Sequence, residues 1–329
     1  MIRFGVHRID QFPGKHPGPH DWLRWGHLDY RLLRTHIPPS EAEVAVFEGV
    51  TFRMQLSSGI FRTTSPARFR DLDEWLTPVL QRNAGAAAAL DILDWAASDC
   101  STSARWHASL KAAFPNCRLT ASDLNVYIIE MIPRDARGVY ILDAALGLLQ
   151  YVQEPFVIRM VPPEPAWLAV NWMLARRARR RFERLWQDGQ IDSAAIRFGP
   201  GQQEIRKGGF LFRRIPLIHP SALALEQSSH SFRICRHSVF DPAETPADVI
   251  RTMNILNAGY FDAPALKRGA ENVCRSLRDG GIWIVGRTIR EEPALHHVSV
   301  LRKSGGRFQL LERYNEKSEA EDAALAVGL

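Results

Sequence analysis

Residues 90–102 read LDILDWAASDCST, and the interpretation of the chain's fold starts from them. An apolar run ends in an acid, Asp94, a set of small residues follows, and a helix is expected from Ser101. A strand, a small-residue turn and a helix N-terminus together form a place for a nucleotide-like ligand, because backbone N–H groups come close to the ligand there. The sequence therefore predicts a strand–turn–helix unit around Asp94.

The segments that follow this turn alternate between strand and helix patterns. Strands are expected at 86–96, 117–124 (ending at Asp123), 230–242, 247–256 and 281–288. Helices are expected at 101–114, with Ser101 as N-cap, and at 262–281, capped by Asp262 and ended by Gly280 and Gly281. A final hairpin is expected over 296–314 around Ser304 to Gly306. This alternation is typical of an α/β, doubly wound, mostly parallel sheet.

Two further parts of the chain interrupt or precede this alternation. Residues 1–83 are interpreted as an N-terminal accessory region with a strand at 44–56 and a helix at 69–82. Residues 84–329 are interpreted as the main domain, with an insertion at about 125–229. The insertion is expected to hold a hairpin at 137–152 and a basic, amphipathic helix at 165–186.

Composition limits the class of protein and its partners. The chain has 329 residues and a net charge of +6, which permits an anionic partner without implying nucleic acid. No apolar run reaches the roughly 18–20 residues of a membrane span, and no signal-peptide pattern opens the chain. Four widely spaced cysteines indicate reduced thiols, so we expect a cytoplasmic protein. The histidines at 7, 16, 20, 27 and 36 match no ligand spacing, and no metal is expected.

Asp94, the small-residue turn, Asp123 and the final hairpin occur in an order that resembles the class I S-adenosylmethionine-dependent methyltransferases. The resemblance covers about 85–124 and 230–314. The family has three spaced glycines after the acid, whereas this chain has Ala96, Ser98 and Cys100 there. The segment DVIRTMNILNAGYF, residues 248–261, is also similar to the chemotaxis-receptor glutamate methyltransferases.

This resemblance implies a seven-stranded sheet with a terminal antiparallel hairpin and a helical insertion, S-adenosylmethionine as cofactor, and a small-molecule acceptor with an oxygen or nitrogen nucleophile. The residues that it places at the cofactor are Asp94, Ala96, Ser98, Asp99, Asp123, Leu124, Ser238, Val239 and Met253. The candidates for catalysis are Asn254 and Asn257, which could position the acceptor, and His219 and His237, which could act as bases.

Several alternatives stay open at this point. A methyltransferase-like domain can be catalytically silent and serve as a binding or interaction protein, or can methylate carboxylates of a protein. Asp99 either contacts the ligand or caps the helix. The arginines at 176–184 form a solvated face, a membrane-surface contact or a nucleic-acid contact. Small side chains in the turn are tolerable at negative φ, but cost about 1 kcal/mol or more each if the backbone is left-handed. The sequence predicts no oligomeric state.

Overall fold

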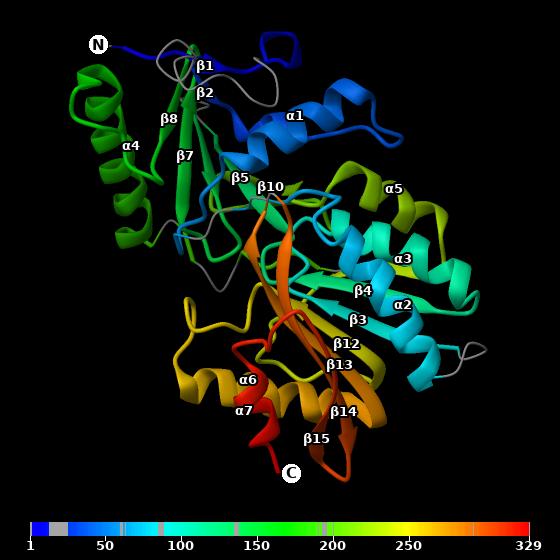
Figure 1. Ribbon diagram of the computed structural model, residues 1–329. Coiled ribbons are helices and arrows are strands. Elements are labelled where there is room, and N and C mark those ends of the chain that lie inside the picture. The colour runs from blue at the N-terminus through cyan, green and yellow to red at the C-terminus, as the bar shows by residue number, and fades with distance from the viewer. Residues whose placement is uncertain are drawn as a thin grey trace. The chain divides into compact units, whose positions relative to one another are not determined.

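The computed structural model describes residues 2–12, 26–59, 62, 64–84, 89–134, 138–189, 191–192, 196–199, 201–291 and 293–328 (Figure 1). The chain divides into two compact units. Unit 1 comprises Met1–Thr63 and Asn125–Pro220, and unit 2 comprises Thr64–Leu124 and Ser221–Leu329. The N-terminal region and the insertion therefore belong largely to one unit, while helix α2 (Arg70–Ala84) belongs to unit 2.

Unit 1 is built on an antiparallel sheet of six strands in the order β8-β7-β6-β5-β10-β9. Its strands are β5 (Tyr127–Pro133), β6 (Val139–Leu142), β7 (Leu148–Gln153), β8 (Phe156–Arg159), β9 (Glu204–Lys207) and β10 (Phe210–Pro216). A short parallel pair, β1 (Gly5–Val6) and β2 (His27–Leu28), precedes them. The expected hairpin at 137–152 is confirmed as β6–β7. The expectation of a helical insertion is wrong, because this part of the chain is mainly an antiparallel sheet.

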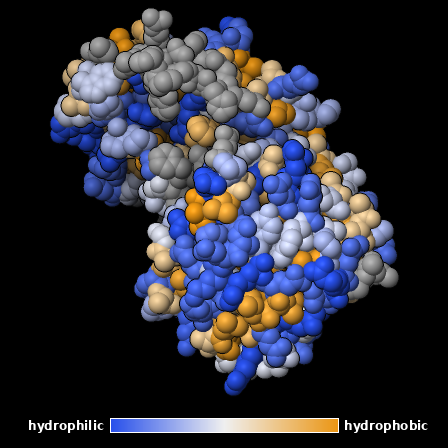
Figure 2. Space-filling view, viewed as in Figure 1, coloured by the Kyte–Doolittle hydropathy of each residue, from blue (hydrophilic) through white to orange (hydrophobic). Residues whose placement is uncertain are grey.

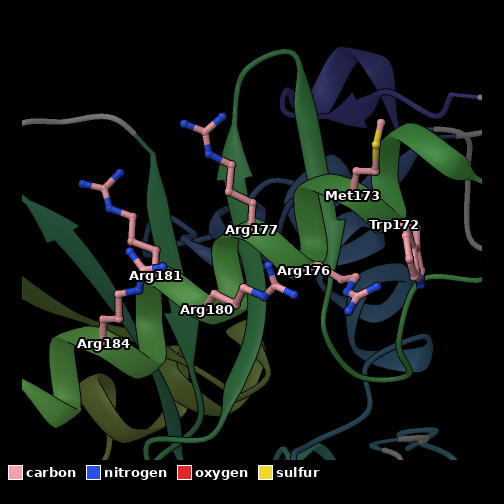
Figure 3. A pocket seen from close by; sticks show the side chains of 7 residues that line it. All are labelled: Trp172, Met173, Arg176, Arg177, Arg180, Arg181 and Arg184. Carbon is pink, nitrogen blue, oxygen red and sulfur yellow. The ribbon is translucent and has the colours of Figure 1, made fainter.

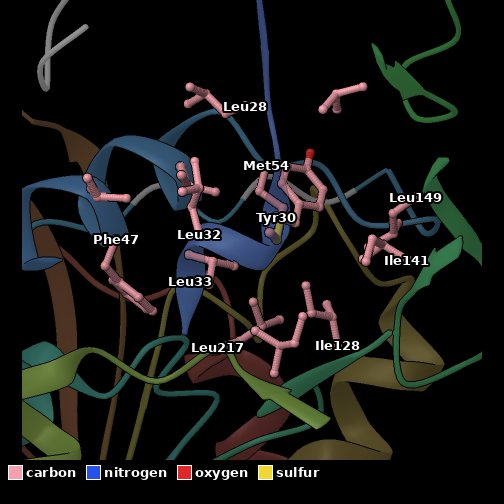
Figure 4. Close-up of a cluster of buried hydrophobic side chains, with 14 of the residues drawn as sticks. Leu28, Tyr30, Leu32, Leu33, Phe47, Met54, Ile128, Ile141, Leu149 and Leu217 are labelled. Atoms are coloured by element: carbon pink, nitrogen blue, oxygen red, sulfur yellow. The ribbon is translucent and has the colours of Figure 1, made fainter. Parts of the chain in front are cut away.

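Helices pack on both faces of the unit 1 sheet. Since successive residues of a strand point to opposite faces, two neighbours in β6 contact different helices. Ile141 packs with Phe47 of α1 (Glu41–Phe52) in one apolar cluster, which also takes in the 3-10 helix η3 (Tyr30–Leu33) (Figure 4). Its neighbour Tyr140 packs with Phe182 of α4 (Ala169–Gln187) in another cluster. A short 3-10 helix, η1 (Ile9–Gln11), completes the N-terminal part. The basic helix predicted at 165–186 is confirmed.

The strand expected at 44–56 is wrong, since these residues lie mostly in α1. Ser40 and Glu43 form a capping box: the Ser40 hydroxyl accepts the Glu43 N–H at 3.3 Å, and the Glu43 carboxylate accepts the Ser40 N–H at 2.8 Å. This reciprocal pair starts a helix despite the β-branched residues that suggested a strand. Val46 and Val50, four residues apart, are both buried on its inner face.

Unit 2 contains the sheet that the sequence predicted, with seven strands in the order β11-β4-β3-β12-β13-β14-β15. The strands are β3 (Asp91–Trp95), β4 (Arg118–Asp123), β11 (Phe232–Arg236), β12 (Ala247–Met253), β13 (Leu277–Arg290), β14 (Leu295–Ser304) and β15 (Arg307–Tyr314). The first five are parallel, and β14–β15 is the predicted antiparallel hairpin. The strand order reverses between β3 and β12, the kind of switch point at which ligands bind in open α/β sheets.

Helices lie on both faces of this sheet, so it is doubly wound. On one face, α6 (Ala263–Ser276) and α7 (Glu321–Leu325) pack against Ile250 and Trp283. On the other, α2 and α3 (Ser101–Ala113) contact Arg251. Helix α5 (Pro220–Ser228) leads into β11. In the ranges described above, no helix has the length and apolar character needed to cross a membrane.

Of the two predicted ends of helix α6, the N-terminal one is confirmed and the C-terminal one is wrong. The Asp262 side chain accepts the Ala265 N–H at 2.8 Å, so the predicted N-cap of α6 is confirmed. Gly280 and Gly281, however, do not end this helix. Helix α6 stops at Ser276, and both glycines lie within β13, which begins directly at Leu277.

Candidate functional site

Three left-handed residues shape the turn between β3 and α3. Ala96, Ser98 and Cys100 have φ values of 58°, 54° and 61°. L-residues adopt this conformation at a cost of roughly 1–2 kcal/mol each, which glycine avoids. The chain thus keeps the backbone form for which glycine is suited, at each position where the resembled family has glycine, while carrying side chains.

Neighbouring strands hold this turn in place. The Ala97 N–H donates to the Ser122 carbonyl of β4 at 2.8 Å, and the Ser98 N–H donates to Asp123 Oδ2 at 2.9 Å. The Ser98 hydroxyl accepts from Thr64 Oγ1 at 3.0 Å. Because β3 and β4 are parallel, the turn and Asp123 lie together at the carboxyl edge of the sheet. Leu124, the next residue, is 49% exposed.

Asp94 lies beneath this edge in a buried charge cluster. Its Oδ1 accepts from Arg251 Nε at 2.9 Å and its Oδ2 accepts from Arg251 Nη2 at 2.5 Å, while Arg251 Nη1 donates to Asp73 Oδ1 at 2.8 Å. The Ser103 hydroxyl adds a bond to Asp94 Oδ2. The guanidinium carbon of Arg251 is 3.9 Å from the centre of the Trp106 ring. The cluster of Asp94, Arg251 and Asp73 therefore joins β3, β12, α2 and α3.

Burial and charge oppose each other in this cluster. Burial lowers the pKa of Arg251, but Asp94 and Asp73 overcome this effect, so its pKa is raised and it stays charged. Burial raises the pKa of Asp73 to about 7, against the attraction of Arg251. This cluster is not among the features predicted from the sequence. One signal was available: Arg251 interrupts an apolar strand, and a buried arginine requires an acid beside it.

The segment after β11 contributes three of the predicted residues to the same edge. The His237 N–H donates to the Asp123 carbonyl at 3.1 Å, and its ring lies 4.7 Å from that of Trp95, centre to centre. Ser238 Oγ accepts the Phe240 N–H at 3.2 Å. Val239 is buried, and its carbonyl accepts from Asn272 at 2.9 Å. Burial lowers the pKa of His237, which keeps its imidazole neutral at pH 7.

The two asparagines after β12 are held by the backbone. Asn254 follows Met253, the last residue of β12, and is left-handed with φ 63°. Its Oδ1 accepts the Thr288 N–H at 2.6 Å. Asn257 Nδ2 donates to the Asn254 carbonyl at 3.1 Å, and its Oδ1 accepts the Gly259 N–H at 3.0 Å. Both amides therefore shape the loop between β12 and α6.

Two further candidates have structural partners. Asp99 is buried, and its Oδ1 accepts from the Ser101 N–H at 3.0 Å and from the Ser101 hydroxyl at 2.7 Å. It thus supports the start of α3, whose N-cap position is Cys100 and not Ser101 as expected. His219 belongs to unit 1, where it packs edge-on against Phe47 and lies 3.4 Å from Glu48 Oε1.

The N-terminal histidines of the described residues each pair with a different carboxylate. His7 Nδ1 is 3.0 Å from Asp29, His27 Nε2 is 2.8 Å from Glu164, and His36 Nδ1 is 2.7 Å from Glu43. His16 and His20 lie outside the described residues.

Comparison with known proteins gives distant structural matches only. No protein-family model matches the chain, and no curated protein matches it in sequence. Among solved structures it is similar to an O-methyltransferase of neocarzinostatin biosynthesis bound to S-adenosyl-L-homocysteine and a naphthoic acid, at 13% identity and a TM-score of 0.24. That match covers 68% of this chain, which spans 41% of the enzyme.

Two other similar structures match over more of their length. A sugar N-methyltransferase from Streptoalloteichus sp. ATCC 53650 is 12% identical, with a TM-score of 0.31 over 80% of this chain and 78% of that one. An S-adenosylmethionine-dependent methyltransferase from Clostridium acetobutylicum ATCC 824 is 10% identical, with a TM-score of 0.30 over 78% and 76%. Matches at these scores carry no weight for function, which has to be inferred from the residues of unit 2.

Proposed function

We propose that unit 2 is a methyltransferase that binds S-adenosylmethionine at the carboxyl edge of its parallel sheet. The observation that supports this most is the turn itself, in which Ala96, Ser98 and Cys100 are all left-handed. Backbone strain of about 1–2 kcal/mol per residue tends to persist where function requires the conformation. A left-handed turn of small residues lets backbone N–H groups approach a ligand closely.

The residues around the turn fit the parts of this cofactor. Asp123, whose Oδ2 accepts the Ser98 N–H, would hold the ribose hydroxyls, because a carboxylate can accept several hydrogen bonds at once. Leu124 and Val239 would hold the adenine, and Ser238 would offer it a hydrogen bond. Ala96, Ser98 and Met253 would hold the methionine part. Asp94 has an indirect role, because its hydrogen bond with Arg251 holds the end of β3, where the turn begins.

When bound, the cofactor supplies a methyl group that its sulfonium already activates. The chain then has to align the acceptor and, where needed, take up a proton. Asn254 and Asn257 fix the loop after β12 that borders the acceptor. Burial lowers the pKa of His237 and keeps its imidazole neutral, and its buried Nε2 has no hydrogen-bond partner among the described residues, so we propose it as the group that would take up the proton. We propose a small-molecule oxygen or nitrogen nucleophile as the acceptor.

Isothermal titration of S-adenosylmethionine and S-adenosylhomocysteine into the purified chain tests this proposal. The variant Asp123→Asn keeps an oxygen for the Ser98 N–H but loses the charge. Hydrogen bonds to charged groups contribute about 1.5–3 kcal/mol, so the variant should bind roughly 10- to 100-fold more weakly. Asp279→Asn, an exposed acid in β13, is the matched control and should bind like the wild type.

Absence of binding by the wild type would favour a catalytically silent, interaction-only domain. Carboxylate methylation of a protein is a further alternative, since it comes from the similarity of residues 248–261. Arg251 and Asn254 in that segment hold the fold together, so they provide no support for that substrate class.

A further inference from the structure

Helix α4 of unit 1 presents a row of arginines on one face. The helix has six arginines and a single acid, Glu183. It buries Ala178 and Phe182 against the sheet. On the outer side, Met173 and the exposed Arg176, Arg177, Arg180 and Arg184 recur at helical spacing and so share a face. The part of the molecule where Figure 1 places α4 is largely hydrophilic in Figure 2.

The charges of this row are available to an external partner. Within the described residues, Arg177, Arg180 and Arg184 take part in no ion pair, while the Arg176 guanidinium covers the Trp172 ring at 4.7 Å. A hollow of about 680 Å³ is lined by the four arginines of this row, by Arg181 of the same helix, and by Trp172 and Met173 (Figure 3). This site offers donors for several phosphate groups.

A second hollow adjoins the row and is partly apolar. It measures about 520 Å³ and shares Arg177 and Arg181 with the first. Its walls include the apolar side chains of Val139, Val152 and Leu174, together with the polar Gln153 and Glu154. An anionic head on the arginines and an apolar part against these walls would be accommodated together, which fits an amphiphile better than a free anion.

Large apolar side chains are exposed at the N-terminal end of α4. Trp167 and Met173 are 52% and 56% exposed, and Phe4 is 52% exposed. The Arg3 backbone exchanges two hydrogen bonds with the Asn171 side chain, so the N-terminal strand lies beside the start of α4. Exposed aromatic and apolar side chains next to arginines are typical of surfaces that enter the headgroup region of a bilayer.

We propose that this face of unit 1 docks on a bilayer containing anionic phospholipids. Arg177, Arg180 and Arg184 contact headgroup phosphates, and Trp167 and Met173 enter the interface. Nucleic acid would use the same arginines but would leave Met173 without a role, and Trp172 is already covered by Arg176. The proposal concerns unit 1 and does not depend on methyl transfer by unit 2.

The test is co-sedimentation of the full chain with phosphatidylcholine vesicles, with and without phosphatidylserine. Binding should require phosphatidylserine and weaken with salt. Each arginine near an anionic surface contributes about 1 kcal/mol, or roughly fivefold in affinity. The variant Arg177→Gln/Arg180→Gln/Arg184→Gln should therefore bind on the order of 100-fold more weakly. Trp167→Ser/Met173→Ser should lose affinity without changing the salt dependence.

The matched control removes the same charge from unit 2. Lys267, Arg268 and Arg275 are exposed on α6, and their triple Gln variant should bind vesicles like the wild type. Equal loss in both triple variants would mean that net charge alone is responsible, which contradicts the proposal. Equal binding to neutral vesicles, or binding of a duplex oligonucleotide with none to vesicles, would also overturn it.

Discussion

The left-handed turn gives a direct stability prediction for Ala96→Gly. Ala96 has φ 58°, a conformation that costs an L-residue about 1–2 kcal/mol. Glycine removes this cost, but the unfolded chain then gains conformational entropy equivalent to about 0.5–1 kcal/mol. We therefore expect Ala96→Gly to raise the free energy of unfolding by about 0.5–1 kcal/mol, as shown by a higher urea midpoint at an unchanged slope.

The neighbouring residue provides the matched control. Ala97 is not left-handed and is 8% exposed, so Ala97→Gly should lower the free energy of unfolding by about 0.5–1 kcal/mol. The two substitutions delete the same methyl group one residue apart and should have opposite signs. If Ala96→Gly destabilises the protein as much as Ala97→Gly does, the reasoning about strain in this turn is refuted.

Three other predictions concern the buried charge cluster within unit 2 and the helix cap of α1 within unit 1. Arg251→Met removes the cation that lies between the buried Asp94 and Asp73 and should cost about 3–5 kcal/mol in urea unfolding, whereas Arg278→Met, on a half-exposed ion pair, should cost less than about 1 kcal/mol. Because the pKa of Asp73 is raised from 3.8 to about 7, its contribution to stability is present below about pH 4 and is lost as pH rises through about 7. In a series of urea midpoints measured against pH, Asp73→Asn should remove this dependence. An unchanged pH profile in the variant would refute the assignment to Asp73. Ser40→Ala removes the cap of α1 and should lower the stability of unit 1 by about 1 kcal/mol, measured by hydrogen exchange of α1 amides; equal exchange rates would contradict the role of the capping box.

The sheet of unit 2 could be predicted because its local signals agree with one another. Apolar strands end at Asp94 and Asp123, Asp262 caps a helix, and Ser304 to Gly306 turn a hairpin, so each element is indicated by adjacent residues. The alternation of strands and helices indicates a mostly parallel sheet, but it does not give the order of the strands. Unit 1 could not be predicted in this way, because its sheet needs segments far apart in the chain, such as β5 with β10.

The sequence indicates that the turn and Asp123 lie at one edge of the sheet, but it does not indicate the contacts of each residue predicted there. The turn and Asp123 follow from local patterns, whereas the partners of Asp94, Asn254 and Asn257 depend on tertiary contacts. Asp94 is bonded to Arg251, which is 157 residues away in the sequence. A single sequence shows that a carboxylate ends a strand, but it does not show which cation lies beside it.

Hydrogen exchange in the presence and absence of S-adenosylhomocysteine shows which part of the chain the cofactor contacts. If the carboxyl edge of the unit 2 sheet binds the cofactor, amides of residues 96–101, 123–125 and 237–239 should gain protection when the ligand is added. Amides of residues 176–184 in α4 should exchange at the same rate in both samples. Unchanged exchange at all three edge segments with saturating ligand would contradict the account, and so would protection confined to α4.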